Sequence, residues 1–203
     1  MNGETDRISI LCEGKTKIVM SSGGRSDQVI LRPKDDITAG DGAKHDIIVG
    51  KAEIATTTTC NVFAFLRECR LKTAFLERID PRAFRATKCD MIPVEVVVRR
   101  EAHGSALMRA PWLAKGHVFP KLVAEYYLKT SGKRWKGREI PKDDPYMRIA
   151  DGSARLWRAD QPIAGTDPFM TISSEEICGG DKFAFMAKTA RRTFLLLEKA
   201  WAL

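Results

Sequence analysis

Residues 88–105, KCDMIPVEVVVRREAHGS, bring together side chains that can bind an anionic ligand. Arg99 and Arg100 directly follow an apolar run, and Gly104 and Ser105 come a few positions later. A guanidinium group can donate two parallel hydrogen bonds to a phosphate or a carboxylate, and ligands often lie where a buried strand ends. On composition alone, the same stretch also fits a core strand with a basic, solvated end.

The strand that must position these groups is indicated by its valines. Positions 94 and 96–98 are all valine, which favours an extended strand over a helix. The almost continuous apolar run from residue 91 to residue 98 predicts that the strand is buried on both faces. Glu95 interrupts this run, and its carboxylate needs a partner because burying an unpaired charge is costly.

Residues 8–20, ISILCEGKTKIVM, read as a strand, a tight turn at Gly14 and a second strand. The letters GKT do not form a P-loop, because that motif needs a glycine where Ser9 stands and a helix after the turn. What remains is a glycine hairpin whose amides and whose Lys15 and Lys17 ammonium groups could cover phosphates. An ordinary exposed hairpin has the same pattern.

Residues 34–42, KDDITAGDG, contain two glycines and three aspartates, which predicts a loop rather than a regular element. Asp41 followed by Gly42 is typical of a simple hairpin turn. The polar side chains also suit a loop that binds a substrate amine or a metal ion. The spacing does not choose between these alternatives.

The rest of the chain mixes strand and helix patterns. We expect helices at residues 46–71, 105–109 and 183–203, and strands at residues 28–31, 75–79 and 122–128. Residues 112–120, 130–144 and 151–169 are expected to be loops, and the second of these is long, polar and rich in glycine and lysine. The last helix is strongly amphipathic, with Phe183, Phe194 and Trp201 on its apolar face.

Composition and charge restrict the class of protein. A chain of 203 residues is long enough for one large domain or two small ones, and no apolar run has the length of a membrane span. The net charge of +8 fits either nucleic acid or phosphate-bearing small molecules. We favour small molecules and expect no nucleic-acid partner, because the lysines and arginines are dispersed. Five scattered cysteines indicate reduced thiols and a cytoplasmic protein.

The segments CEGKTK, KDDITAGDG, DMIPVEVVVRREAHGS, YYLK and DDPYM occur in this order from about residue 10 onward. In this order they resemble the SAICAR synthetase family. The resemblance implies an α+β fold of two lobes with a cleft like that of kinases or ATP-grasp proteins. Residues 1–90 would form an antiparallel lobe with the phosphate-covering hairpin, and residues 91–203 a larger α/β lobe for nucleotide and substrate.

The resemblance also implies an activity, which is the ATP-dependent ligation of L-aspartate to carboxyaminoimidazole ribonucleotide (CAIR) in purine biosynthesis, with Mg²⁺. It implies that ATP is bound by Gly14, Lys15, Thr16, Lys17, Met91, Glu95 and Lys129. It implies that CAIR and aspartate are bound by Asp36, Thr38, Gly40, Asp41, Gly42, Arg99 and Ser105. On this basis Lys15, Lys129 and Asp41 are the expected catalytic residues, and a homo-oligomer is compatible with the family.

This chain departs from the family pattern at several positions. Cys12 stands where the family has an aromatic residue, Asp143 stands where it has histidine, and the loop at 130–144 is longer than usual. The family's acidic strand that holds the metal would follow the last helix, so we expect the metal ligands to lie beyond Leu203. We therefore expect this chain not to turn over. The alternatives are an inactive nucleotide-binding or interaction module and, as a third choice, an RNA-binding protein.

Overall fold

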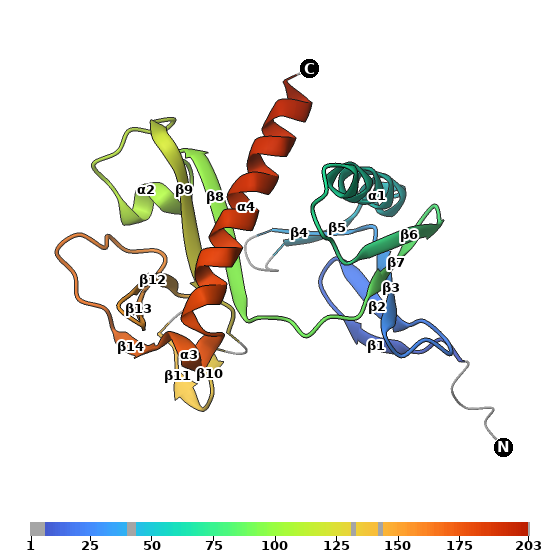
Figure 1. Cartoon of the computed structure of the whole chain (residues 1–203), viewed down its shortest axis with the longest axis horizontal. Helices are drawn as coiled ribbons and strands as arrows, with labels where there is room; N and C mark the ends of the chain where they lie inside the picture. Colours follow the sequence, from blue (N-terminus) through green and yellow to red (C-terminus); the bar gives the residue numbers. More distant parts are fainter. Residues whose placement is uncertain (1–6, 40–43, 131–132, 142–143, 203) are drawn as a thin grey trace. The chain divides into compact units, whose positions relative to one another are not determined.

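The computed structural model describes residues 7–39, 44–130, 133–141 and 144–202 (Figure 1). The chain divides into two compact units, Met1–Asp90 and Met91–Leu203, which we call the first and the second unit. Each unit contains a five-stranded sheet, and every strand pair in the described residues is antiparallel. The expected α+β class is confirmed, and the antiparallel pairing extends to the second unit, where an α/β lobe was expected.

The first unit consists of a sheet, a separate strand pair and one long helix. Its elements are β1 (Ile10–Glu13), β2 (Lys17–Ser21), β3 (Gln28–Pro33), β4 (Asp36–Ala39), β5 (Lys44–Ile47), α1 (Lys51–Glu68), β6 (Phe75–Asp80) and β7 (Ala83–Thr87). The sheet has the order β1-β2-β3-β7-β6, and β4 pairs with β5. Helix α1 packs on β3, β6 and β7, and a core of Cys60, Phe75 and Phe84 lies between helix and sheet.

The strand pair β4–β5 changes two expectations. Residues 36–39 form a regular strand instead of part of an irregular loop, while Gly40, Asp41 and Gly42 lie outside the described residues. Helix α1 begins at Lys51 instead of residue 46, because Lys44–Ile47 pairs with β4 and Gly50 adopts a φ of 87°. Residues distant in sequence fix this helix start, so the local apolar pattern could not locate it.

Two polar contacts stabilise α1 near its start. Asp35 Oδ1 accepts a hydrogen bond from the Ala52 amide at 2.8 Å, which satisfies one of the amides that a helix start leaves unpaired. Thr56 is fully buried, and its hydroxyl donates to the Ala52 carbonyl oxygen at 2.8 Å. This backbone contact lets a run of threonines, which are poor helix formers, remain helical.

The second unit contains a sheet of the order β14-β13-β12-β9-β8 and a long C-terminal helix. Its elements are β8 (Val94–Glu101), α2 (Ser105–Arg109), β9 (Val118–Leu128), β10 (Arg134–Trp135), β11 (Arg138–Glu139), β12 (Tyr146–Ala150), β13 (Ser153–Trp157), β14 (Met170–Ser173), α3 (Ser174–Ile177) and α4 (Gly180–Trp201). The expected loops at 112–120, 130–144 and 151–169 were therefore wrong where β9 begins and where β10, β11 and β13 form. The short helix at 105–109 is confirmed.

Strand β8 has two different faces, so the expected burial on both faces is wrong. Its residues are half-buried or exposed throughout. Val94, Val96 and Val98 pair with Leu128, Tyr126 and Ala124, whereas Glu95, Val97 and Arg99 pair with Tyr127, Glu125 and Val123. Because side chains alternate along a strand, the even-numbered residues share one face and the odd-numbered residues the other. We call these the even face and the odd face.

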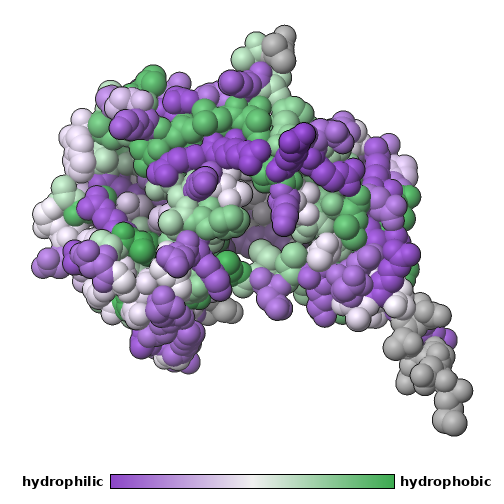
Figure 2. All heavy atoms as spheres, in the orientation of Figure 1, coloured by the Kyte–Doolittle hydropathy of each residue, from purple (hydrophilic) through white to green (hydrophobic). Residues whose placement is uncertain are grey.

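Helix α4 covers the even face. The Tyr126 hydroxyl donates to the Phe183 carbonyl oxygen at 2.8 Å, and the two rings meet edge to face. Further along, Arg100 donates two hydrogen bonds to Glu198. The amphipathic pattern is confirmed where α4 begins, since Phe183 and Ala187 are buried. Apolar side chains of α4 also reach the surface, among them Phe185, Leu195 and Trp201. Figure 2 shows, in green, hydrophobic residues at the surface of the molecule. No helix in the described part of the chain is both long and apolar enough to span a membrane.

Candidate functional site

The glycine hairpin of the first unit is closed by backbone hydrogen bonds. The Gly14 amide donates to the Lys17 carbonyl oxygen at 2.9 Å, and the Lys34 amide donates to the Thr16 carbonyl oxygen at 2.8 Å. The Lys34 ammonium group lies 2.8 Å from Glu13 Oε1. Residues 13–17 are exposed, so the hairpin presents its lysines to solvent. These contacts hold a basic turn in a defined shape, which is what binding a polyphosphate requires.

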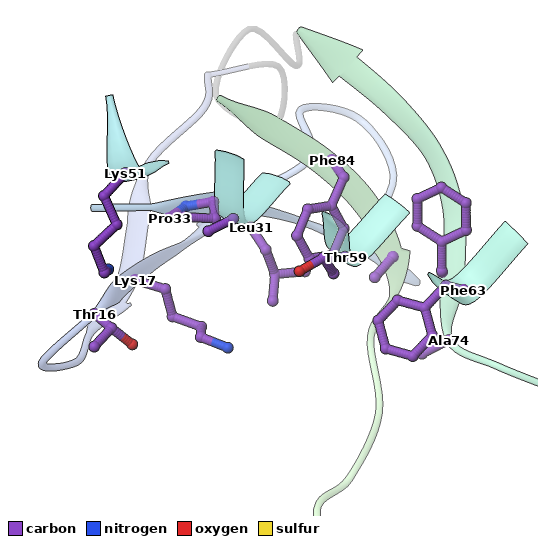
Figure 3. Close-up of a pocket in the computed structure, with 12 residues that line it drawn as sticks. Thr16, Lys17, Leu31, Pro33, Lys51, Thr59, Phe63, Ala74 and Phe84 are labelled. Atoms are coloured by element: carbon purple, nitrogen blue, oxygen red, sulfur yellow. The ribbon is translucent and has the colours of Figure 1, made fainter. Parts of the chain in front are cut away.

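A pocket of about 320 Å³ opens beside this hairpin, between α1 and the sheet. Lys17 and Lys51 lie towards one end, Phe63 and Ala74 towards the other, and Leu31, Thr59 and Phe84 lie between them (Figure 3). The Lys51 ammonium group also donates to the Lys34 carbonyl oxygen at 3.2 Å. A cavity with apolar walls and two ammonium groups suits a molecule that has both a flat apolar part and a negative charge.

Asp36 is the centre of a second polar cluster in the first unit. Its Oδ1 atom lies 2.8 Å from His45 Nε2 and 3.5 Å from the Lys34 ammonium group. The hydrogen bond with His45 lowers the pKa of Asp36. Burial opposes this with a smaller effect than that bond, and the charge of Lys34 lowers the pKa further. Thr38 pairs with His45 on the adjacent strand. Asp36 and Thr38 are therefore close together, and sequence reasoning had missed His45.

The odd face of the second unit brings together Arg99 and Ser105, the two residues that the family resemblance implies for a substrate phosphate. Arg99 Nη2 donates to Ser105 Oγ at 3.2 Å, and Nη1 donates to the His103 carbonyl oxygen at 3.2 Å. Between β8 and α2, Gly104 adopts φ 54° and ψ −129°, a conformation open almost only to glycine. This turn is what brings Ser105 back to the guanidinium group.

Behind Arg99 lies a buried charge cluster. Glu125 accepts hydrogen bonds from Arg99 Nε at 2.6 Å, from Arg109 Nη2 at 2.5 Å and from the Tyr127 hydroxyl at 3.1 Å. Burial raises the pKa of Glu125, but the hydrogen bonds from the two arginines outweigh burial and leave the pKa below its usual value. Glu125 is therefore a carboxylate at neutral pH, and it holds Arg99 by its Nε edge.

A third cluster forms where β8 begins and β9 ends. The Lys129 ammonium group contacts Asp144 Oδ2 and lies 3.4 Å from Glu95 Oε2. Asp144 Oδ1 also accepts from the Thr130 amide at 2.7 Å. The hydrogen bond with Asp144 raises the pKa of Lys129, with a further contribution from Glu95. Glu95 is exposed, so the expectation that it is a buried carboxylate is wrong. Met91, just before β8, is 85% exposed.

The charge cluster escaped sequence reasoning, although a signal for it was present. The argument that a carboxylate inside an apolar strand needs a partner was applied to Glu95, in the run of valines. The same argument applies to Glu125 in the run LVAEYYL, and Glu125 is the buried residue of the two. Its partners Arg99 and Arg109 come from other elements, so only the folded chain identifies them.

Among the described residues, no three histidine, cysteine, aspartate or glutamate side chains are grouped so that they could hold a metal ion. Glu95 and Asp144 are neighbours, but the Lys129 ammonium group lies against both. The described residues therefore do not form a Mg²⁺ site of three protein ligands by themselves.

Comparison with solved structures supports the fold. A phosphoribosylaminoimidazole-succinocarboxamide synthase from Ehrlichia chaffeensis superposes on 94% of this chain and 68% of its own, with a TM-score of 0.68 and 20% identity. A SAICAR synthetase solved in complex with ADP matches 97% of this chain and 69% of its own, with a TM-score of 0.69 and 24% identity. Fold and site geometry together define an α+β protein of two units with clusters of charged side chains in each.

Comparison of sequences identifies the family. The SAICAR synthetase family model matches residues 10–137. A phosphoribosylaminoimidazole-succinocarboxamide synthase of Chloroflexus aurantiacus is 38% identical over 192 residues, and one of Roseiflexus castenholzii is 36% identical over 192 residues. Both alignments cover 95% of this chain, and they cover 65% and 66% of the two relatives. The chain belongs to the SAICAR synthetase family, and it spans about 65% of the length of the first of these curated relatives.

Proposed function

We propose that this chain carries nucleotide-binding and substrate-binding parts of an ATP-dependent ligase that joins L-aspartate to CAIR. The observation that carries the proposal is the 38% identity to a phosphoribosylaminoimidazole-succinocarboxamide synthase over 95% of this chain. The arrangement of Arg99 with Ser105 supports it, because a guanidinium group and a hydroxyl at a fixed distance suit a phosphate monoester. The solved relative in complex with ADP supports a nucleotide as ligand.

The proposed chemistry activates a carboxylate, which is a poor acyl donor as it stands. The γ-phosphoryl group of ATP is transferred to the CAIR carboxylate, which gives ADP and an acyl phosphate. The aspartate amine then attacks the acyl carbon, forms the amide bond and displaces phosphate. Such a transfer depends on positioning and on charge neutralisation more than on covalent help from the protein. Members of the family use Mg²⁺, and the metal remains part of the proposal on the strength of the resemblance.

Within this chemistry, we propose separate roles for the two units. In the first unit, Gly14, Lys15, Thr16 and Lys17 bind ATP phosphates, and Asp36, Thr38, Gly40, Asp41 and Gly42 bind CAIR and aspartate. In the second unit, Met91, Glu95 and Lys129 contact the nucleotide, and Arg99 and Ser105 bind the CAIR phosphate. Lys15, Lys129 and Asp41 are the proposed catalytic residues. The substrates are small molecules and the proposed location is the cytoplasm.

The proposal is tested by binding and turnover in one set of measurements. Isothermal titration calorimetry with ATP, CAIR and L-aspartate should show saturable binding of ATP and of CAIR, and release of ADP is followed in the presence of Mg²⁺ and all three substrates. Failure of the chain to bind ATP, or to bind CAIR, would overturn the proposal. Binding of both without ADP release would assign this chain the role of a binding module.

A further inference from the structure

The odd face of the second unit holds a charge cluster of which the proposed chemistry uses only Arg99 directly. Arg99, Arg109 and Tyr127 all donate to one carboxylate, that of Glu125, at 2.6, 2.5 and 3.1 Å. Glu125 is 8% exposed, so each of these bonds is largely shielded from water. Hydrogen bonds between charged groups in such surroundings are short and directional, and they fix the orientation of their donors.

Arg109 is the immobile end of this cluster. It is 2% exposed, and its guanidinium carbon lies 5.2 Å from the ring centre of Tyr127 and 4.9 Å from that of Tyr146. Its Nη1 atom also donates to the Ala159 carbonyl oxygen at 3.4 Å. Two aromatic rings, a carbonyl oxygen and a carboxylate therefore fix this guanidinium group from several sides.

Arg99 is the outward end of the cluster. Its side chain is 18% exposed, and its Nε atom, next to the aliphatic stem, is the atom bound to Glu125. The two Nη groups at the far end of the side chain contact the His103 carbonyl oxygen and Ser105 Oγ. Glu125 thus sets the plane of the Arg99 guanidinium group and leaves the two Nη groups of Arg99 at the proposed phosphate site.

The charges in the cluster balance in a way that favours an anionic ligand. Glu125 alone would neutralise Arg99, and Arg99 would then attract a phosphate only weakly. Arg109 supplies a second, buried cation that neutralises Glu125 instead, so two cations and one anion leave one net positive charge. The solvent-accessible share of that charge is at Arg99, because Arg109 is almost completely buried.

We propose that Glu125, held in place by Arg109, is a positioning residue that orients Arg99 for the 5′-phosphate of the substrate ribonucleotide. This inference rests on the proposed function, since it requires Arg99 to bind that phosphate. Two simpler roles lead to different results. If only charge mattered, removing the Glu125 carboxylate would strengthen phosphate binding. If the cluster only stabilised the fold, its loss would weaken all ligands of the chain alike.

The test compares Glu125→Gln with the wild-type chain and with Glu198→Gln. Glu198 is a matched control, because it also accepts two hydrogen bonds from an arginine, Arg100, but lies on the α4 side of β8. The Kd values of CAIR, of its riboside without phosphate and of ATP are measured by calorimetry, and Tm reports folding. We expect Glu125→Gln to bind CAIR about tenfold more weakly, with ATP unaffected and Glu198→Gln like the wild type.

A double-mutant cycle separates positioning from additive damage. If Glu125 acts through Arg99, Arg99→Ala combined with Glu125→Gln binds CAIR no more weakly than Arg99→Ala alone. Additive losses, an equal loss of ATP affinity, or tighter CAIR binding by Glu125→Gln would overturn the inference. Failure of the wild-type chain to distinguish CAIR from its riboside would instead overturn the proposed role of Arg99, and this inference with it.

A milder variant keeps the test available if Glu125→Gln does not fold. Tyr127→Phe removes the hydroxyl that lies 3.1 Å from Glu125 Oε2 and keeps the ring beside Arg109. We expect a smaller loss of CAIR affinity of about threefold, again without effect on ATP. Unchanged CAIR affinity in a folded Tyr127→Phe chain, together with an Arg99 Nε–H whose proton exchanges freely with solvent by NMR, would overturn the inference.

Discussion

The ammonium group of Lys129 lies 3.4 Å from the Glu95 carboxylate, and both side chains are about half exposed, at 50% and 52%. The pair is exposed, so its contribution to folding stability is small. Because Lys129 already contacts Asp144, the Glu95 carboxylate is nevertheless available to accept a hydrogen bond from a ligand hydroxyl. The pair therefore contributes little as a stabilising contact and fits the proposed role of both residues at the nucleotide.

Glu95→Ala should weaken ATP binding and leave the fold intact. The proposed role of Glu95 is to contact the nucleotide, and its exposed position means that its removal changes stability by no more than about 0.5 kcal/mol. Calorimetry with ATP and a urea unfolding curve measure the two effects. Unchanged ATP affinity together with increased stability would show that Glu95 is only tolerated at its position.

Arg99→Lys should weaken CAIR binding by about one to two orders of magnitude. Lysine keeps the charge but has no Nε–H for Glu125 and cannot contact the His103 carbonyl oxygen and Ser105 Oγ with a planar fork. The measurement is the Kd of CAIR, and Arg100→Lys on the even face is the control. Equal affinity of Arg99→Lys and the wild type would leave Arg99 as a member of the buried charge cluster with no role in phosphate binding.

Arg109→Met should lower the free energy of unfolding by about 3 kcal/mol. The change fills the volume between Tyr127 and Tyr146 but takes one of its two cations from the buried Glu125 carboxylate. Arg100→Met is the control, because the ion pair of Arg100 with Glu198 is much more exposed and its loss should have a far smaller effect. Similar urea midpoints for the two variants would contradict this account of the cluster.

Gly104→Ala should cost about 1–3 kcal/mol of stability through backbone strain alone. The φ of 54° and ψ of −129° are unfavourable for alanine, whereas a Cβ atom added at this position would meet no atom within 4 Å. Gly180→Ala, at the start of α4, is the control, because an added Cβ makes only an ordinary contact at 3.6 Å with Ser174 Oγ. Chemical denaturation measures the free energy of unfolding of both variants. A Gly104→Ala chain that is as stable as the wild type would contradict the backbone strain.

The stability of the wild-type chain should fall more steeply in acid than that of Glu125→Gln. The pKa of Glu125 is lowered in the folded chain, so its contribution is complete above the ordinary value of 4.5 and is lost as the pH falls through the lower, folded pKa. A series of Tm measurements from pH 6 down to about pH 3 should show the two curves converging at the acid end. Parallel curves over this range would mean that Glu125 is not paired as described.

Local patterns in the sequence predicted much of the fold, and the resemblance to the family implied the Arg99–Ser105 pair. The glycine hairpin, the short helix at 105–109, the strand at 75–79 and the amphipathic start of α4 all depend on near neighbours in sequence. Arg99 and Ser105 are also near in sequence, and the turn between them needs only Gly104. Such features are determined by residues within a few positions of each other, and a pattern can therefore predict them.

Features fixed by distant residues could not be predicted in the same way. The start of α1 depends on β4 and on the Asp35 side chain, which lie before the helix in sequence. The partners of Glu125 come from β8, from α2 and from its own strand. The prediction that β8 is buried on both faces was wrong for a related reason. The run of valines gives no sign that one face of the strand carries polar groups while α4 covers the other.

The two faces of β8 also constrain how its gene can change. A substitution at an even position must fit the packing of α4, and a substitution at an odd position must fit the groups around Glu125. A single substitution therefore affects one face of the strand and leaves the other face unchanged. Gain of one codon between Glu95 and Arg99 would exchange the faces of every residue beyond it, placing Arg99 at the position of Arg100 beside Phe194 and Val98 at the position of Arg99 near Glu125. The length of this segment should therefore vary less among homologous genes than its composition, with single-residue insertions rarer than conservative substitutions.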